Sequence, residues 1–419
     1  MQTMGWDLLL TGAEVIDVGG GHVGRFDVAV QSGRVAAVAP RLTGDAVRHL
    51  DLTGKVITPG LVDLHTHVFA GGGYWGIDPA PIAWRSGVTT WVDAGSSGAY
   101  NFPAFRERLS GYQVKVPVLL HVSAIGLTGQ EGEARDLKHL DVPAAIATAQ
   151  ANREHIVGIK VRMARGTVGG NALEPLHRAI EVATACQLPV MVHIGDRPPN
   201  AEDVVPLLRP GDIITHCASG IAAGPNLLTP QMREAYQRGV AFDIGHGAGS
   251  FAFDVLEAQL AAGMPPHSIS TDLHSRCVHG PVFDMPTTMA KMLAVGMPLE
   301  QVVQAATAGP ARLLDLDVGT LAVGSRADLA VFTVVEGRFE LVDVHGNRRT
   351  SPLRLHNEAT YVAGQPLPAV APEPPPPWVP LTSAQRSAFS HQQQAVRRLL
   401  TEPLVDPDGL EEQFPRHGG

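Results

Sequence analysis

The sequence predicts an α/β protein, a (β/α)8 TIM barrel with a small β-sandwich domain formed by both ends of the chain. Three observations predict this fold. Eight short apolar runs alternate with longer Ala-rich amphipathic segments through the middle of the chain. Turn-rich β segments without helical periodicity flank this region on both sides. With 419 residues, the chain is long enough for a barrel and a smaller satellite.

The first segment, residues 1–58, is expected to form short strands. DLLLTGAEVIDV is apolar with a glycine break, FDVAVQSGRVAAVAP is typical of a hairpin around Gln31, Ser32 and Gly33, and GKVITPG ends the segment. Two further β runs, GTLAVGSRADLAVFTVV and FELVDVHGNRR, lie in residues 317–365 and are too short to bury a core alone. We therefore expect residues 1–58 and 317–365 to form one composite sandwich.

The barrel is predicted over residues 59–316. Its strand candidates, in chain order, are LVDLHTH, VTTWVDA, VPVLLHV, IVGIKVRM, LPVMVHIG, DIITHC, VAFDIGHG and HSISTDL. Helix-like stretches such as PAAIATAQANRE, PLHRAIEVATAC and TPQMREAYQRG lie between them. The hydrophobic fraction is 44% and the aromatic fraction only 5%, so the core must consist mainly of Val, Leu, Ile and Ala, which suits buried parallel strands and their covering helices.

Residues 366–419 differ in composition from the rest of the chain. LPAVAPEPPPPWVP is Pro-rich and expected to be extended, SAQRSAFSHQQQAVRRLLTEP has the pattern of one amphipathic helix, and EEQFPRHGG is typical of a frayed end. We expect a flexible C-terminal extension. The alternative is an arm that docks on its own barrel or on another subunit.

Charge and composition exclude several classes of function. The net charge of -9 and the pI of about 6.0 argue against a nucleic-acid-binding surface, which needs a basic face, whereas a small anionic substrate needs only one local arginine. No apolar run is long enough to cross a bilayer and no secretory signal is recognisable, so we expect no membrane association and a cytoplasmic location. The odd number of cysteines, Cys186, Cys217 and Cys277, predicts reduced thiols.

Polar residues end several of the predicted barrel strands. His65 and His67 close LVDLHTH, and because positions i and i+2 of a strand face the same side, both imidazoles should point into the barrel at the rim where barrel enzymes work. An HxH pair alone is equally compatible with structural histidines. His193, His216 and Asp272, however, end three further strands in the same register, where an unpaired polar side chain would be costly. Together these residues predict a divalent metal site.

Lys160 lies inside VGIKVRM, a strand expected to be buried on both faces. An unpaired ammonium is very costly there, and burial lowers the pKa of a lysine and favours the neutral amine. A neutral amine can take up carbon dioxide to form a carbamate, an anionic oxygen ligand able to bridge two metal ions. A salt bridge to a nearby acid is the alternative interpretation.

These motifs resemble a known group of proteins. PGLVDLHTH, the later lysine strand, two single histidines and STDLH are similar to the metal-dependent amidohydrolase superfamily. FDIGHGAGSF and STDLHS resemble its deacetylase-like branch, whose members are also named amidohydrolase or dihydroorotase-like protein. DAGSSGAYNF, GIKVRM, VMVHIGD, THCASG, ATAGPARLLDL and GTLAVGSRADLAVF extend the resemblance, which covers residues 6 to about 360 and leaves out the Pro-rich tail.

The resemblance implies a ligand set and a mechanism. The two histidines of the HxH motif and Asp272 would hold the more buried metal ion, His193 and His216 would hold the more exposed one, and carbamylated Lys160 would bridge both. The implied metal is zinc, as two ions. The implied reaction is hydrolysis by a metal-bound hydroxide, with Asp272 as general base and then general acid.

The substrate class is implied by the resemblance alone: removal of a small acyl group such as acetyl from an N-acyl amino acid or an O-acyl hydroxy acid. Arg162, two residues beyond Lys160, should face the same side and could grip a substrate carboxylate, with a salt bridge at the rim as the alternative. His246, at the end of the seventh strand, is a candidate substrate contact, with rim packing as the alternative. The expected partner is a small molecule that carries a carboxylate.

Three other functions are compatible with parts of this pattern. A cyclic-amide hydrolase of dihydroorotase or hydantoinase type would use the same metal set. A mononuclear nucleobase deaminase fits less well, because such enzymes have a glutamate where Asp196 follows His193, and they lack a ligand lysine. A non-catalytic assembly protein on the same barrel is expected to have lost ligand positions, and here all are filled. Homo-oligomerisation is left open.

Overall fold

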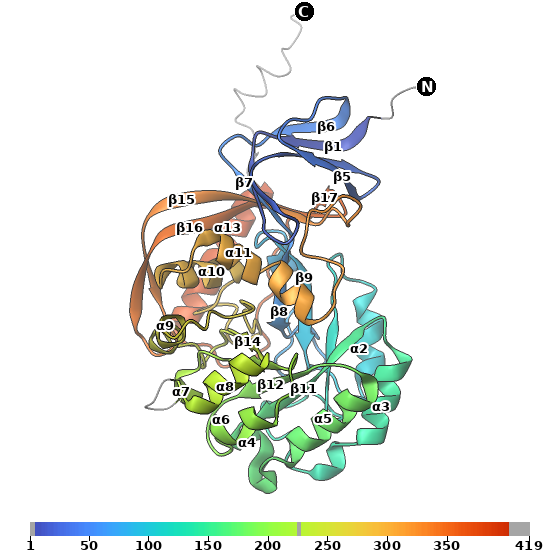
Figure 1. The fold of residues 1–419 in the computed structure, drawn as a ribbon, viewed down its shortest axis with the longest axis vertical. Coiled ribbons are helices and arrows are strands. Elements are labelled where there is room, and N and C mark those ends of the chain that lie inside the picture. The colour runs from blue at the N-terminus through green and yellow to red at the C-terminus, as the bar shows by residue number, and fades with distance from the viewer. Residues whose placement is uncertain (1–4, 224–227, 402–419) are drawn as a thin grey trace, which may run out of the picture.

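A curled sheet of parallel strands forms the centre of the molecule (Figure 1). The computed structural model describes residues 5–223 and 228–401. The seven regular strands of this sheet are β8 (Leu61–Thr66), β9 (Val88–Ala94), β10 (Val118–His121), β11 (Ile156–Met163), β12 (Val190–Ile194), β13 (Ile213–Thr215) and β14 (Ala241–Asp243). They follow one another in chain order, and each pairs in parallel with the next.

The eighth predicted strand closes the ring without forming a regular ladder. Single parallel bridges join Ser268 to β14 and Leu273 to β8. Residues 268–273 therefore lie between the last and the first strand of the sheet, and the predicted (β/α)8 barrel is confirmed. The ladder stays short because Asp272 has a positive φ of 49°, which turns the backbone out of the extended conformation.

Helices cover the outside of the barrel. Their bounds are α1 (Ala80–Ala83), α2 (Phe102–Leu109), α3 (Val142–Ala151), α4 (Arg165–Val168), α5 (Glu174–Cys186), α6 (Ala201–Val204), α7 (Gly220–Ala223), α8 (Pro230–Arg238), α9 (Phe253–Ala261), α10 (Met285–Ala294), α11 (Leu299–Ala305) and α12 (Ala308–Leu313). In α5 the buried residues Leu176, Ala179 and Val182 recur at helical spacing, and this helix packs on β11 and β12. Apolar periodicity thus orients the helix toward the strands.

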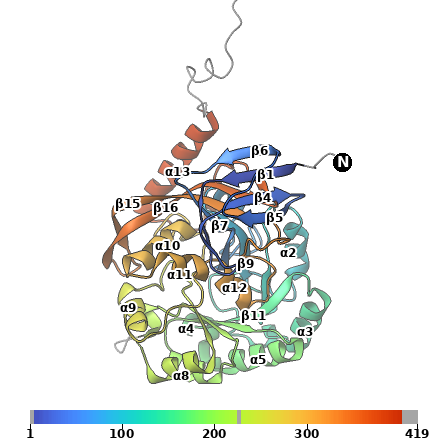
Figure 2. The same cartoon turned by 45° about the horizontal axis from the view of Figure 1, so that its top comes forward.

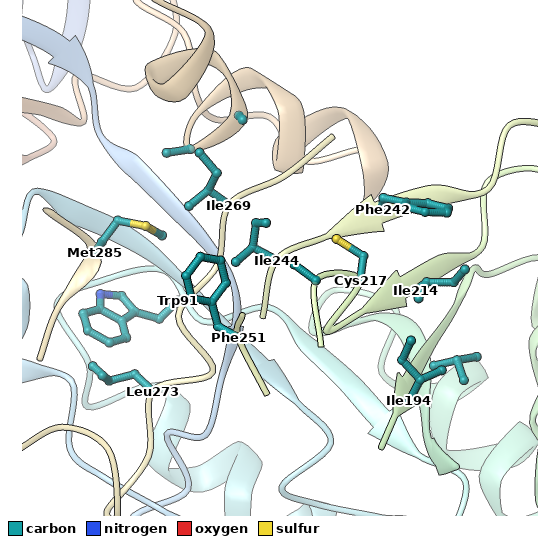
Figure 3. Close-up of a cluster of buried hydrophobic side chains, with 14 of the residues drawn as sticks. Trp91, Ile194, Ile214, Cys217, Phe242, Ile244, Phe251, Ile269, Leu273 and Met285 are labelled. Atoms are coloured by element: carbon teal, nitrogen blue, oxygen red, sulfur yellow. The ribbon is translucent and has the colours of Figure 1, made fainter. Parts of the chain in front are cut away.

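The largest apolar core lies between the barrel strands and these helices. Figure 3 shows the part of it around Ile244, Phe251 and Ile269, which are fully buried. They belong to the same buried cluster as Trp91 of β9 and Met285 of α10. Because a close-packed core deforms little, this packing gives the strand ends a rigid base.

Two further sheets form the predicted sandwich on one side of the barrel (Figure 2). Their strands are β1 (Trp6–Thr11), β2 (Glu14–Asp17), β3 (His22–Arg25), β4 (Asp27–Gln31), β5 (Arg34–Ala39), β6 (Ala46–Asp51), β7 (Val56–Pro59), β15 (Leu329–Val342), β16 (Arg348–Val362) and β17 (Gln365–Pro366). One sheet has the order β5-β4-β1-β6 and the other the order β17-β16-β15-β7-β2-β3. Leu8, Val28, Ile57 and Leu329 contribute to a separate apolar core that both sheets share.

The two ends of the chain meet at β7, which pairs in parallel with β2 and antiparallel with β15. The predicted hairpin around Ser32 and Gly33 joins β4 and β5, and both residues have positive φ (50° and 73°), as a tight two-residue turn requires. The hairpin of β15 and β16 is longer than the sequence indicated. It extends to α9 and α10, where Arg349 forms ion pairs with Asp254 and Glu257.

The tail docks on its own barrel, which is the alternative to the expected flexible extension. Gln385 of α13 (Ser383–Thr401) donates from Nε2 to the carbonyl oxygens of Arg276 (2.7 Å) and Gly280 (2.8 Å), in the loop after the eighth strand. The Phe389 ring packs edge-on against His279, with ring centroids 4.7 Å apart. The EEQFPRHGG end lies outside the described residues.

The three cysteines form no disulfide bonds with one another. Cys186, Cys217 and Cys277 are buried and free. Among the residues that the structure describes, no helix combines the length and the apolar composition that a membrane crossing needs.

Candidate metal centre and substrate cavity

The predicted ligand residues converge at the C-terminal ends of the barrel strands. His65 and His67 come from β8 and the turn after it, and their Nε2 atoms lie 3.2 Å and 3.1 Å from Oδ1 of Asp272 in the eighth strand segment. Lys160 comes from β11, and its Nζ lies 3.1 Å from Nε2 of His65. The alternation of side chains along a strand accounts for the shared direction of His65 and His67.

His193 of β12 and His216, which follows β13, form the other half of the group. Nδ1 of His193 and Nε2 of His216 face each other at 2.8 Å. Nε2 of His216 also lies 3.9 Å from Oδ2 of Asp272, so the two oxygens of this carboxylate face different histidines. Potential ligand atoms of His65, His216 and Asp272 all lie within 4.8 Å of one another, and all three residues are buried. Imidazole nitrogens and a carboxylate at this spacing fit divalent metal ions such as zinc.

Hydrogen bonds behind the rings set which nitrogen faces the centre. Nδ1 of His65 lies 2.7 Å from the hydroxyl of Thr215, which donates its proton to Oδ2 of Asp243 at 2.7 Å. Because that hydroxyl proton is taken, Nδ1 of His65 must be the donor, which leaves the lone pair of Nε2 directed at the centre. His216 likewise donates from Nδ1 to the carbonyl oxygen of Gly245. Both imidazoles are therefore oriented and protonated as metal ligands require.

Two of the predicted ligands have a backbone conformation that L-residues rarely adopt. His216 has a φ of 63° and Asp272 a φ of 49°, each costing roughly 1–2 kcal/mol. Gly247 packs directly against the second of these, since a Cβ at this glycine would lie only 2.5 Å from Oδ2 of Asp272. The rigid core behind the strand ends keeps both residues in these conformations and so aims their side chains into the barrel.

Burial dominates the electrostatics at Lys160. It lowers the pKa of this lysine to about 7, although the carboxylates of Asp272 and Asp243 raise it. Nζ contacts Nε2 of His65 and, at 3.4 Å, Sδ of Met191. Within the described part of the chain the amine has no carboxylate at ion-pair distance, so the alternative of a structural salt bridge receives no support.

The histidines of the centre are held in their neutral form. Burial lowers the pKa of His65, His67 and His193 well below the usual value, and the charge of Lys160 adds to this effect. Burial also lowers the pKa of His216 to about 4. Neutral imidazole is the form that binds a metal ion, so the group is ready for metal binding near neutral pH.

Two buried aspartates hold the strand ends from behind. Asp63 accepts hydrogen bonds from the N–H (2.9 Å) and the hydroxyl (2.6 Å) of Thr271 and thereby ties β8 to the segment that carries Asp272. Asp243 accepts three hydrogen bonds from hydroxyl groups of the sixth and eighth strands. Burial raises the pKa of Asp63 to about 7 and that of Asp243 to about 6. Through their hydrogen bonds, the two aspartates position the strand ends that carry the ligands.

A cavity of about 370 Å³ opens onto the centre, a size that suits a small molecule. Its lining comes from the C-terminal ends of the strands and from the segments that follow them: His67, Trp75, Arg162, His193, Gly195, Asp196, Ser219, Ile221, Ala248, Gly249, Ser250, Asp272, His274 and Arg276. The cavity wall thus contains three predicted metal ligands, His67, His193 and Asp272, and two arginines, Arg162 and Arg276.

Arg162 lines this cavity, and its guanidinium is already paired with an acid. Nε and Nη2 donate to the two carboxylate oxygens of Glu133 at 2.6 Å and 2.8 Å. Burial alone would raise the pKa of Glu133, but the charge and hydrogen bonds of Arg162 lower it below the usual range. The salt bridge at the rim is therefore present, and a role in substrate binding would have to be shared with Glu133.

His246 does not line the cavity. Its side chain is fully buried and stacks on Phe251. Its Nδ1 donates to the carbonyl oxygen of Gly247 at 2.9 Å, and its Nε2 accepts from Nζ of the buried Lys291 at 2.7 Å. Because both ring nitrogens have partners inside the protein, the geometry does not support the predicted substrate contact.

Sequence reasoning did not single out Trp75, Arg276 or Glu133. Trp75 follows the glycines of AGGGYW in the loop after β8, and Arg276 follows STDLHS, so the same motifs that mark the ligands also lead into the cavity wall. The guanidinium of Arg276 lies over the Trp75 ring, 5.9 Å from its centroid. No local pattern marks Glu133, because it lies in the segment after β10 and its partner, Arg162, lies on β11.

Comparisons with known proteins agree on one family. The model of the amidohydrolase family matches residues 216–351. A curated deacetylase from Agrobacterium fabrum is 38% identical over 351 residues, which cover 81% of this chain and 86% of the relative. The similarity thus covers most of both chains.

Two solved structures share the fold at similar identity. One is described as an adenine deaminase, with 33% identity and a TM-score of 0.82, and the other as a dihydroorotase, with 35% identity and a TM-score of 0.80. Each comparison covers 86% of this chain and 99% of the other chain, so part of this chain has no counterpart in either structure. The three relatives bear names of three different reactions on one architecture.

Proposed function

The chain belongs to the deacetylase-like branch of the amidohydrolase superfamily, and we propose that it removes a small acyl group, such as acetyl, from an N-acyl amino acid or an O-acyl hydroxy acid. As a member of this branch it is a hydrolase that acts on carbon–nitrogen bonds. The observation that carries the proposal is the position of Asp272. Its two carboxylate oxygens face different histidines. Asp272 also lines the cavity, whose wall contains the two arginines.

Two divalent metal ions, zinc by chemical preference, would complete the centre. The HxH histidines and Asp272 would hold one, His193 and His216 the other, and a carbamate on Lys160 would lie between them. The buried amine has a pKa of about 7 and, among the residues that the structure describes, no carboxylate at ion-pair distance, which supports the carbamate. Bound there, the ions would polarise the scissile carbonyl and lower the pKa of a water molecule.

Asp272 would move the proton during the reaction. Its side chain is only 11% exposed but lines the cavity, so it can reach both the attacking water and the substrate. It would accept a proton from that water and pass it to the leaving nitrogen or oxygen. Arg162, in the cavity wall, would share a carboxylate on the leaving part of the substrate with Arg276, the second arginine of the lining, because its own guanidinium is paired with Glu133.

A cyclic-amide hydrolase is the second candidate. The dihydroorotase structure at 35% identity favours it, because the same ligand set would serve a ring amide. The two candidates differ in whether the cleaved amide lies in a ring, which an assay decides directly.

The test combines metal content with a comparison of substrates. We expect about two zinc ions per chain by elemental mass spectrometry, and fewer in a Lys160→Ala variant. Hydrolysis is then measured on N-acetyl-D- and L-amino acids, O-acetyl hydroxy acids, dihydroorotate, hydantoin and adenine. Preferential cleavage of acetylated acids supports the proposal, and preferential ring opening supports the second candidate instead. A protein that takes up no divalent metal under any condition would refute both.

A further inference from the structure

The two arginines of the cavity differ in how their charge is compensated. Arg162 forms the bidentate pair with Glu133, so most of its hydrogen-bonding capacity is used inside the protein. Arg276 lies in the loop after the eighth strand and is half-buried. Among the described residues, no carboxylate lies within ion-pair distance of Arg276. The cavity therefore contains one guanidinium that lacks a described counter-ion.

Several contacts fix Arg276 at the cavity wall. Its guanidinium lies over the indole of Trp75, and the N–H of Ser275 donates to the Trp75 carbonyl oxygen at 3.0 Å, which joins the loops after the first and eighth strands. The N–H of Arg276 donates to Nδ1 of His274 at 3.1 Å. Its carbonyl oxygen accepts from Nε2 of Gln385 at 2.7 Å, so helix α13 also holds this residue.

We propose that Arg276 binds the anionic group of the substrate, a carboxylate, and that Gln385 of the C-terminal helix positions Arg276 for this contact. This inference rests on the proposed function. Arg276 would be the residue that makes the enzyme prefer substrates with a carboxylate over their neutral analogues. A half-buried guanidinium without a counter-ion gains most from a carboxylate, which can accept two parallel hydrogen bonds from it.

The net charge of the molecule favours a local cation where the cavity binds the anionic group. With a net charge of -9, the protein as a whole repels an anionic substrate. Arg162 is compensated by Glu133, and Asp196 and Asp272 add negative charge to the cavity lining. Arg276 is thus the side chain of the lining best able to attract a carboxylate.

The C-terminal helix gives Arg276 a fixed backbone. Gln385 donates to both the Arg276 and Gly280 carbonyl oxygens, and Phe389 packs on His279, so α13 contacts the loop at three successive points. A side chain anchored in this way loses less conformational entropy on binding. The tail would therefore influence substrate affinity without touching the substrate.

The test compares pairs of substrates in matched variants. Each pair consists of an acetylated acid and its neutral carboxamide. Arg276→Met removes the cation, and Arg233→Met, on the exposed face of α8, removes the same charge outside the cavity lining. For Arg276→Met we expect KM for the acid to rise about 10- to 100-fold, while kcat and the KM for the carboxamide stay within about twofold. Arg233→Met should change neither.

A second pair of variants tests the positioning role. Gln385→Ala should raise KM for the acid by about three- to tenfold with kcat unchanged, because Arg276 keeps its charge but loses its fixed position. Gln394→Ala, at an exposed position of the same helix, should have no effect. A purely structural role of Gln385 would alter acid and carboxamide alike. If Arg276→Met does not fold, Arg276→Lys should give a smaller rise for the acid alone.

The outcomes separate this inference from the proposed function. The role of Arg276 would be overturned if Arg276→Met left KM for the acid unchanged, or if it raised KM equally for the acid and the carboxamide. An unchanged preference for the acid in Gln385→Ala would overturn the role of the helix. If metal-loaded wild-type protein cleaves neither member of any pair, the proposed function fails and this inference fails with it.

Discussion

Asp272 combines several unusual features in one side chain. It lies in the irregular eighth strand segment, has a positive φ, and directs its two oxygens to different histidines. Gly247 makes room for it, because any side chain at that glycine would collide with Oδ2. A strained residue held by its surroundings is a common property of active-site positions.

The proposed proton transfer predicts a specific defect in Asp272→Asn. The amide cannot accept the proton, so kcat should fall by roughly 100- to 10,000-fold, while KM changes little. Steady-state kinetics on the preferred substrate, together with metal content, measure this effect. Asp196→Asn is the matched control, since Asp196 lines the same cavity but is not among the predicted ligands. An Asn variant that holds its metal and retains kcat would contradict the role of Asp272.

The buried pair of Lys291 and His246 predicts a pH-dependent stability. Burial lowers the pKa of Lys291 to about 7 from 10.5, so the folded protein binds this proton less tightly than the unfolded chain. Lys291 therefore adds no penalty above the unfolded pKa of 10.5 and a growing one as the pH falls toward 7. Wild type should gain stability relative to Lys291→Met between pH 7 and 9.5, on the order of 2 kcal/mol.

Urea unfolding of wild type and Lys291→Met at both pH values measures this difference. Lys160 titrates similarly in both proteins, so its contribution cancels. A difference in unfolding free energy that stays constant from pH 7 to 9.5 would show that Lys291 is not perturbed by burial.

At the residue scale, the sequence predicts where a side chain lies along a strand, but not which distant residue it contacts. The alternation of side chains and the apolar runs before His65, His193 and His216 were sufficient to predict their convergence; their metal binding stays a prediction. The partners of Arg162 and His246 lie 29 and 45 residues away on other elements. The local pattern does not identify these partners, so the sequence leaves open a substrate contact or a salt bridge for Arg162, and a substrate contact or rim packing for His246.

At the scale of elements, the long hairpin of β15 and β16 depends on contacts outside the sandwich. Arg349 donates to both carboxylate oxygens of Glu257 and to Asp254 of α9, and its guanidinium lies over the ring of Phe253. The neighbouring Arg348 forms one exposed ion pair with Glu340 within the hairpin. The two adjacent arginines thus offer a matched comparison.

We expect Arg349→Met to lower the free energy of unfolding by about 1 kcal/mol and Arg348→Met to change it by less than about 0.5 kcal/mol. The first residue belongs to a bidentate network between two elements, whereas the second is well exposed and screened by solvent. Denaturant unfolding followed by circular dichroism measures both. Equal effects of the two substitutions would show that the network contributes nothing beyond an ordinary surface pair.

The elements themselves differ in how far the sequence predicts them. The strands from β8 to β14 follow from apolar runs bounded by turns, and residues 268–273 lie where the eighth was expected. Its irregular pairing depends on the φ of Asp272, which no propensity indicates. Amphipathic periodicity predicts α13, because an apolar stripe on a helix indicates that this face packs against another surface. It does not indicate which surface. Only the structure shows that α13 docks on the loop of Arg276.

At the scale of the whole molecule, the barrel and the space between the two sandwich sheets have different cores. Buried side chains such as Leu61, Ile159 and Ile214 form the barrel core, which continues onto the adjacent sandwich sheet through Val56 and Phe332. Leu8, Val28 and others form the separate sandwich core. Because the two cores are distinct, a perturbation of the centre should be felt mainly in the barrel.

Removal of divalent ions should therefore destabilise the barrel selectively. Without ions, a lysine, an aspartate and four histidines remain close together in the lumen, and bound metal otherwise adds its binding free energy to folding. Chelation should lower the melting temperature. In hydrogen–deuterium exchange it should deprotect β8, β12, β13 and residues 268–273, while β1 and β4 stay protected.

A variant that lacks the ligands separates this effect from a direct action of the chelator. In a His65→Ala, His67→Ala double variant, chelator should change exchange in β8 far less than in wild type, and re-addition of zinc should restore protection in wild type alone. Equal deprotection of barrel and sandwich after verified metal loss would mean that the ions stabilise the molecule as one cooperative unit. Unchanged exchange would mean that the strand ends hold their conformation without metal, through Asp63 and Asp243.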